Sequence, residues 1–337
     1  MAQDFRIGSL DGLRGIAASA VVYAHINFFY PSSNAWINLP TGDEAVAIFF
    51  SLSGFLMALL YGNRPVAAGD YLVHRFARIY PVYLVAVLFV AALSAIYGAE
   101  YIHPITGTTE LLRHVLLLGS TGVFWSIPPE IQFYIFFLLV WLWFSDPKKY
   151  QIVAVATAAF LIVDAYFDFP GPGILLTSKL PYFLFGALAG RFYSQQKNHP
   201  DGDATGIAVL ALLVFFVVSR GFWPLKTSFW GISSALTGTV IVYLAACGNR
   251  ISAAVLASKP LAFVGKISFS LYLFHLPIMF LGMHVFHFLP VETALALSIA
   301  LAYLVAWASY TVIEDPSRRF LTGLWRNRQR PVPAAAE

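Results

Sequence analysis

Charged residues are scarce in this chain: Asp, Glu, Lys and Arg make up only 11% of its 337 residues. Hydrophobic residues make up 59%, and the mean hydropathy is +0.72. A soluble domain needs roughly a quarter of its residues to be charged, so that water can solvate its surface. The shortage of charge therefore excludes a soluble fold and predicts an integral membrane protein.

Cysteine and the common cofactor and metal motifs are also lacking. The single cysteine, Cys247, excludes a disulfide within the chain. The sequence has no dinucleotide-binding, phosphate-loop, nucleophile-elbow or HExxH pattern. His284 and His287 are three residues apart, but no further zinc ligand lies near them in the sequence, so we expect no metal site.

The chain instead has ten apolar stretches of about the length that crosses a bilayer. They predict an all-α fold, a polytopic integral membrane helical bundle of about ten transmembrane helices. A further stretch, 110–119, is too short to cross, and we expect it to be an outer-face loop or an interfacial helix. The ten stretches are residues 12–30, 43–61, 79–97, 129–145, 150–168, 174–192, 206–221, 228–246, 267–287 and 292–313.

The distribution of lysine and arginine predicts the orientation, because short cytoplasmic loops carry an excess of these residues. An even number of helices puts both termini on one side of the membrane. With both termini cytoplasmic, 17 of the 21 Lys and Arg residues fall on the cytoplasmic side. These loops account for the net charge of +4 and suit the anionic inner leaflet, so we expect no nucleic-acid partner.

Two ionisable residues share one face of the first predicted helix. Arg14 and His25 are eleven residues apart, and eleven helical steps return the chain to nearly the same direction. The helical rise between them is about 16 Å, so the arginine can lie at the cytoplasmic surface and the histidine near the middle of the bilayer. An intramembrane histidine is a candidate functional residue.

Short motifs in a fixed order give a resemblance to a known family. Residues 9–18, which read SLDGLRGIAA, and the following His25 resemble the start of the membrane-integral acyltransferase 3 family. In that family ten residues separate an arginine from a histidine in the first helix. The other motifs that match are at 49–55, in the RxxR loop 75–78, in the WSxxxE element 125–130, at 268–275 and at 314–316.

The resemblance implies a membrane O-acyltransferase of the bacterial cytoplasmic (inner) membrane. Members of the family move acyl groups, commonly acetyl from acetyl-CoA, to hydroxyls of extracytoplasmic glycans, antibiotics or lipids. For this chain it implies an acyl-CoA donor and a glycan or lipid-linked acceptor, such as a polysaccharide or lipopolysaccharide. The acyltransferase domain would span 1–320, and a short basic, then Pro/Ala-rich cytoplasmic tail would span 321–337. Some members carry a fused SGNH-type domain, and we expect none here.

The resemblance assigns donor binding to Arg14, Arg75 and Arg78. Forked guanidinium contacts suit the phosphates of CoA. Two structural roles compete with donor binding. Asp11 lies three residues before Arg14, so the two can pair on one helix face, which makes Asp11 a further pocket candidate. Arginines at cytoplasmic helix ends are also ordinary topology determinants.

The predicted catalytic residues are His25 and Glu130. A histidine titrates near neutral pH and can act as general base toward an acceptor hydroxyl. Glu130 would orient His25 or balance its charge. Each has a structural alternative: His25 can satisfy a contact in the bundle, and a carboxylate in a first helical turn, here after Pro128 and Pro129, is favoured by the helix dipole.

A polar stripe runs along the predicted helix at 267–287. Ser268, Tyr272 and His275 recur at helical spacing, so they either line an acceptor or thioester pocket or make hydrogen bonds between helices. The same two roles are open to Ser53. A small residue at a close helix contact is the more common role.

A transporter of a small solute or lipid-linked sugar is the alternative function. It would share the helix count and the intramembrane charges, but it would more often show inverted repeats, and we see none in the sequence. Within the acyltransferase interpretation, direct transfer and a covalent acyl-enzyme both fit the residues.

Overall fold

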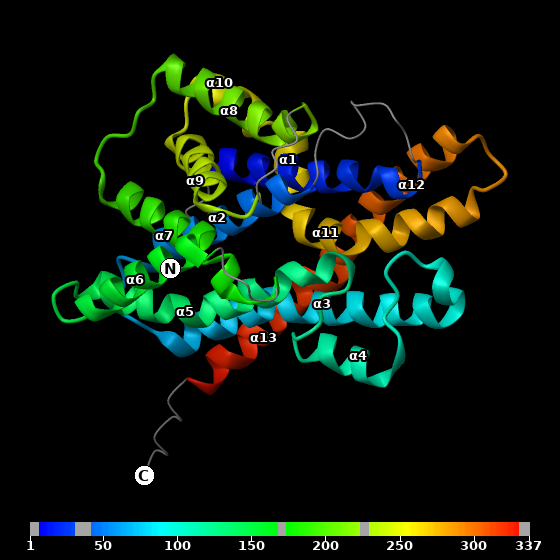
Figure 1. Cartoon of the computed structure of the whole chain (residues 1–337), viewed down its shortest axis with the longest axis horizontal. Coiled ribbons are helices and arrows are strands. Elements are labelled where there is room, and N and C mark those ends of the chain that lie inside the picture. Colours follow the sequence, from blue (N-terminus) through cyan, green and yellow to red (C-terminus); the bar gives the residue numbers. More distant parts are fainter. Residues whose placement is uncertain (1–6, 31–41, 168–172, 223–228, 330–337) are drawn as a thin grey trace, which may run out of the picture.

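The computed structural model describes residues 7–30, 42–167, 173–222 and 229–329 (Figure 1). Within these ranges the chain forms helices and no strand, which confirms the predicted all-α class. The α-helices are α1 (Gly8–Ala24), α2 (Asp43–Tyr61), α3 (Ala68–Tyr97), α4 (Gly107–Val115), α5 (Ile127–Ser145), α6 (Gln151–Phe167), α7 (Leu180–Gln195), α8 (Asp203–Phe222), α9 (Ile232–Cys247), α10 (Arg250–Leu256), α11 (Lys259–Val285), α12 (Val291–Ser309) and α13 (Asp315–Arg328).

Each of the ten apolar stretches overlaps one of these helices, and α4 overlaps the stretch predicted to stay outside the bilayer. Five helical stretches in the described part of the chain are long and apolar enough to cross a membrane. Three of them join several elements, because α3 continues into η2 (Gly98–Glu100), η3 (Gly122–Ser126) continues into α5, and α12 continues through a π-helical turn into α13. The five are Asp43–Tyr61, Ala68–Glu100, Gly122–Ser145, Lys259–Val285 and Val291–Arg328.

The helix pair α9 and α10 is bent by 103° and makes a sixth stretch if it forms one broken span. These helices agree with the predicted membrane bundle. The total of ten spans and the sidedness of the termini stay predictions, because the remaining helices are shorter or more polar.

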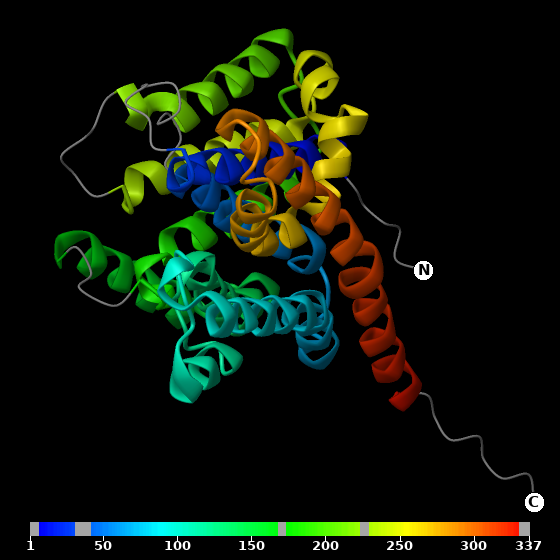
Figure 2. The ribbon, with the colours of Figure 1, turned by 90° about the vertical axis from the view of Figure 1, so that its right-hand side faces the viewer.

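Helix α1 packs along α11 and also contacts α2, α9 and α10. In turn α2 packs along α7, and α11 packs along α12. The last helix, α13, leaves the bundle obliquely and crosses α3 (Figures 1 and 2). The first and last motifs of the sequence are thereby brought to the same part of the molecule.

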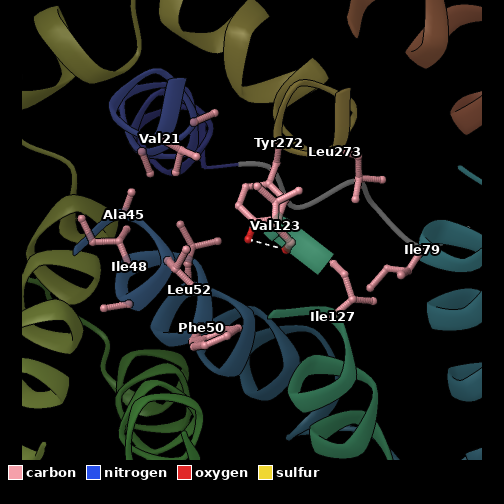
Figure 3. Packing of buried hydrophobic residues seen from close by; sticks show 14 of the residues in the cluster. Val21, Ala45, Ile48, Phe50, Leu52, Ile79, Val123, Ile127, Tyr272 and Leu273 are labelled. Atoms are coloured by element: carbon pink, nitrogen blue, oxygen red, sulfur yellow. Dashed lines mark hydrogen bonds between the residues drawn. The ribbon is translucent and has the colours of Figure 1, made fainter. Parts of the chain in front are cut away.

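One part of the buried core lies where α1, α2, α11 and the start of α5 meet (Figure 3). Val21 from α1, Ile48 and Leu52 from α2 and Ile127 from α5 surround Tyr272 of α11, and all five side chains are almost fully buried. An apolar bundle therefore encloses the polar stripe predicted from the sequence.

Glycines allow the close approach of α2 and α7. A Cβ atom added to Gly54 would lie 1.9 Å from the carbonyl oxygen of Phe183, and one added to Gly186 would lie 2.1 Å from that of Ser51. Neither contact is sterically possible, so any side chain at these positions would separate the helices. Small residues at such contacts let helices associate by direct backbone packing in a membrane.

Replacing Gly54 by alanine should destabilise the protein, because the methyl group would force α2 away from α7. We expect a cost of about 1–3 kcal/mol, the usual range for overpacking a tight core. Thermal unfolding of the purified protein in detergent measures it. Gly323→Ala in α13 is the matched control, because an added Cβ there meets no atom of the described residues within 4 Å. Equal stability of the Gly54→Ala variant and the wild type would contradict this prediction.

Candidate functional site

All but two of the predicted site residues line two neighbouring cavities, and the two exceptions are Asp11 and His275. The first, which we call the arginine cavity, comprises about 690 Å³ of empty space including its opening, and the second, the histidine cavity, about 940 Å³. The arginine cavity is lined by Arg14, Arg75, Arg78, Ser53, Glu130 and Ser268, among others. The histidine cavity is lined by His25, Asp43, His103, Thr121 and Trp125, among others.

Arg75 of α3 is the most deeply buried cation of the arginine cavity, with 7% of its surface exposed. Its guanidinium lies 5.2 Å from the ring centre of Tyr61 and 5.9 Å from those of Tyr71 and Tyr134. Its Nη2 donates a hydrogen bond to the Tyr61 hydroxyl (3.3 Å), whereas its Nε has no hydrogen-bond partner among the described residues. Aromatic faces thus hold the cation and leave donor capacity for an anion in the cavity.

Arg14 of α1 faces the same cavity from the opposite wall. Its Nη2 donates to the Ser268 hydroxyl of α11 (3.2 Å). Its charge is repelled by Arg78 and stabilised by the carboxylates of Asp11, Glu314 and Glu130. Arg14 therefore lines the cavity and also interacts electrostatically with Asp11, which compensates part of its charge.

Glu314 is a buried carboxylate that sequence reasoning did not single out. It ends the π-helical turn Tyr310–Glu314 between α12 and α13, and its Oε2 accepts a hydrogen bond from Ser270 (2.6 Å). It also interacts electrostatically with Arg78 and Arg14. π-Helical turns occur frequently at functional sites. The sequence signal that points to Glu314 is the motif at 314–316. That motif supports the family resemblance but does not assign a role to its glutamate.

Glu130 lies in the first turn of α5, where Pro128 and Pro129 begin the helix as predicted. Its Oε1 accepts hydrogen bonds from Tyr134 (2.5 Å) and Ser53 (3.2 Å). These contacts place Glu130 on the arginine cavity. His25 makes its hydrogen bonds with groups other than Glu130, so the structure does not bring the predicted pair of Glu130 and His25 together.

His25 pairs with a second histidine, His275 of α11. The His25 Nδ1 lies 2.8 Å from the Val21 carbonyl oxygen and 3.1 Å from His275 Nε2. The Nδ1 of the fully buried His275 lies 3.0 and 2.9 Å from the carbonyl oxygens of Leu271 and Tyr272. A helix contact and a functional arrangement are therefore both present at His25.

This geometry fixes which nitrogen carries the proton in each neutral ring. A carbonyl oxygen only accepts hydrogen bonds, so the His275 Nδ1 must donate and its Nε2 is left as an acceptor. The His25 Nδ1 then donates to Val21 and His275. The His25 Nε2 consequently carries the lone pair of the neutral ring, the form required of a general base.

Tyr272 lies between the two cavities and lines both. Its hydroxyl donates to the Val123 carbonyl oxygen (2.8 Å), as drawn in Figure 3, and shares a second hydrogen bond with the Ser126 hydroxyl (2.8 Å). The three members of the polar stripe thus have distinct partners, since Ser268 contacts Arg14 and His275 contacts His25.

The wall of the histidine cavity is polar and aromatic, with Asp43, Thr121 and Trp125 at its surface. His103, in the segment between α3 and α4, also lines it. Burial lowers the pKa of His103, so this ring is neutral at pH 7. Besides the Asp43 carboxylate, the cavity therefore offers uncharged hydrogen-bonding groups and an aromatic face beside His25.

His284 and His287, the histidine pair with metal-ligand spacing, lie away from both cavities. His284 Nε2 is 3.8 Å from the exposed Glu100 carboxylate. In the described part of the chain no group of three His, Cys, Asp or Glu side chains is arranged to hold a metal ion.

Comparison with known proteins supports the family resemblance found in the sequence. The model of a family described as an acyltransferase domain matches residues 7–312. The peptidoglycan O-acetyltransferase OatA of Listeria monocytogenes is 23% identical over 93% of this chain and 56% of its own length. The O-acetyltransferase OatA of Staphylococcus aureus is 26% identical over 92% of this chain and 57% of its own. A Rhizobium radiobacter protein, protein 2 in the picA locus, is 40% identical over 25% of this chain and 43% of its own length.

No solved structure matches this chain. The chain spans a little over half the length of the OatA relatives. The match to the family model covers nearly all of the described residues, both cavities and every motif except the last, at 314–316. The chain therefore belongs to the acyltransferase 3 family.

Proposed function

We propose that this protein is a membrane O-acyltransferase that moves an acyl group, normally acetyl, from cytoplasmic acyl-CoA to a hydroxyl of an extracytoplasmic glycan or glycolipid. The observation that carries the proposal is the meeting of an arginine-lined and a histidine-lined cavity at two side chains, Tyr272 and Val46. The family and the relatives named O-acetyltransferases support it.

Contacts between helix ends support the proposed ten-span topology with cytoplasmic termini. Arg191 at the end of α7 donates to the carbonyl oxygens of Gly62 (2.8 Å) and Phe144 (3.2 Å), at the ends of α2 and α5. All three positions belong to the proposed cytoplasmic side. Tyr30 and Glu292, both on the proposed outer side, are joined by a hydrogen bond of 3.3 Å.

In the proposed mechanism the phosphates of CoA bind Arg14, Arg75 and Arg78 in the arginine cavity. The pantetheine arm then extends toward Tyr272, over a helix rise of about 16 Å between Arg14 and His25. A fixed donor site and a thin arm let the acyl group cross the bilayer without movement of the whole donor. Glu130 balances the charge of the arginines in this scheme.

The acceptor enters the histidine cavity from outside, and its hydroxyl donates to the unprotonated Nε2 of His25. As the hydroxyl oxygen attacks the thioester carbonyl carbon, its proton passes to His25, the new C–O bond forms and the C–S bond breaks. The CoA thiolate then takes up the proton. An acyl-enzyme relay would divide the same changes into two steps.

His25→Ala should lower acetyl transfer by about 100-fold or more, the usual contribution of a general base. The measurement is transfer of labelled acetyl from acetyl-CoA in reconstituted vesicles or whole cells, at matched expression, together with binding of acetyl-CoA. Donor binding should persist, because the arginines lie in the other cavity. His287→Ala, at an exposed histidine, is the control. Undiminished transfer would remove His25 from the mechanism, and solute uptake without transfer would favour the transporter.

Nitrogen-15 NMR of histidine-labelled protein tests the predicted proton positions. Both His25 and His275 should carry the proton on Nδ1, with Nε2 unprotonated, at a pH where the rings are neutral. In the His275→Phe variant the His25 Nδ1 signal should shift, because one of its two acceptors is lost. A proton on the Nε2 of His275 would contradict the assignment.

Arg75→Met should weaken binding of acetyl-CoA by roughly 10- to 100-fold, the effect of losing a charged hydrogen bond of about 1.5–3 kcal/mol. The Michaelis constant for the donor should rise, whereas kcat at saturating donor should change little, since Arg75 is remote from His25. Arg113→Met in α4, at an exposed arginine, is the matched control. An unchanged donor affinity would argue that Arg75 is a structural cation only.

A further inference from the structure

Among the described residues, only two line both the arginine cavity and the histidine cavity: Val46 of α2 and Tyr272 of α11. Neighbouring residues of η3 line different cavities: Val123 and Trp125 line the histidine cavity, and Ser126 lines the arginine cavity. The cavities are therefore adjacent, and one side chain from each of α2 and α11 stands between them.

Tyr272 is held in this position from several sides. Its hydroxyl is hydrogen-bonded to both Val123 and Ser126, one turn of η3, and its ring lies 6.4 Å from that of Phe49 in an edge-to-face arrangement. Only 6% of its surface is exposed. Because the Tyr272 side chain is buried and its hydroxyl has hydrogen-bond partners, the side chain keeps one rotamer. Its ring therefore forms a fixed wall (Figure 3).

Apart from the Ser126 hydroxyl, which is hydrogen-bonded to Tyr272, this end of the arginine cavity is apolar. Leu52, Phe49, Ile79 and Ile127 line it near Tyr272. Under the proposed function the thioester carbonyl has to reach the His25 cavity, so the acyl group must pass the Tyr272 ring. Each methylene beyond the acetyl methyl group has to fit into the same narrow, rigid passage, where one methylene changes relative rates by about 10-fold or more.

We propose that Tyr272 is the residue that sets acyl-donor specificity, by closing the passage between the two cavities so that only a short acyl chain is admitted. The same ring keeps water of the histidine cavity away from the thioester. This inference rests on the proposed function. Without the ring, water could attack the carbonyl in place of the acceptor: a C–O bond forms, the C–S bond breaks, and the free carboxylic acid and the CoA thiol are released.

The test compares the purified full-length wild type, Tyr272→Ala and Tyr272→Phe in vesicles with acetyl-, butyryl- and octanoyl-CoA. We expect the wild type to prefer acetyl over butyryl by at least about 10-fold. Tyr272→Ala should reduce this preference several-fold and raise acceptor-independent thioester hydrolysis. Tyr272→Phe keeps the ring and should retain most of the preference. Tyr243→Ala, at a partly exposed tyrosine of α9, is the control.

If Tyr272→Ala does not fold, Val46→Ala opens the passage from the α2 side, and the preference should shift in the same direction by a smaller factor. An unchanged acyl preference and unchanged hydrolysis in a folded Tyr272→Ala or Val46→Ala variant would overturn the inference and leave the acyltransferase proposal intact. Absence of transfer from every donor by the wild type would overturn the proposed function, and this inference with it.

Discussion

An arginine inside an apolar helix bundle costs several kcal/mol unless other groups compensate its charge. In this protein Arg75 is compensated mainly by the faces of three tyrosines, and Arg14 by a serine hydroxyl and nearby carboxylates. Compensation by aromatic faces leaves the Arg75 Nε without a hydrogen-bond partner in the part of the chain that the structure describes. The bundle thus stabilises buried cations without neutralising them fully, which suits a site for an anionic ligand.

The packing of α1 on α11 positions residues of both cavities. A Cβ added to Gly265 of α11 would lie 1.8 Å from the carbonyl oxygen of Asp11 in α1, so the backbones touch there. Beyond this contact Arg14 of α1 meets Ser268 of α11, and His25, in the short helix η1 (His25–Phe28) that follows α1, meets His275 of α11. A change in the spacing of α1 and α11 would disturb both cavities at once.

The two cavities also differ in electrostatic character. The arginine cavity combines three cations with Glu130 and Glu314 at or behind its wall, whereas the histidine cavity holds imidazoles and a tryptophan beside Asp43. Burial favours neutral imidazole over imidazolium, as the lowered pKa of His103 illustrates. The residues proposed for anion binding and for proton abstraction therefore line separate cavities, with Tyr272 between them.

The helical class follows from the sequence alone, because a chain with so little charge satisfies its backbone in a membrane through helices. Arg14 and His25 both contact α11, as helical periodicity predicts, although α1 ends at Ala24 and His25 begins the short helix η1. Which residues meet is a matter of tertiary packing: His275 rather than Glu130 lies beside His25, Glu314 lies behind Arg14 and Arg78, and Tyr272 lies between the cavities. These partners come from opposite ends of the chain, and their contact depends on the packing of whole helices, which local periodicity does not encode.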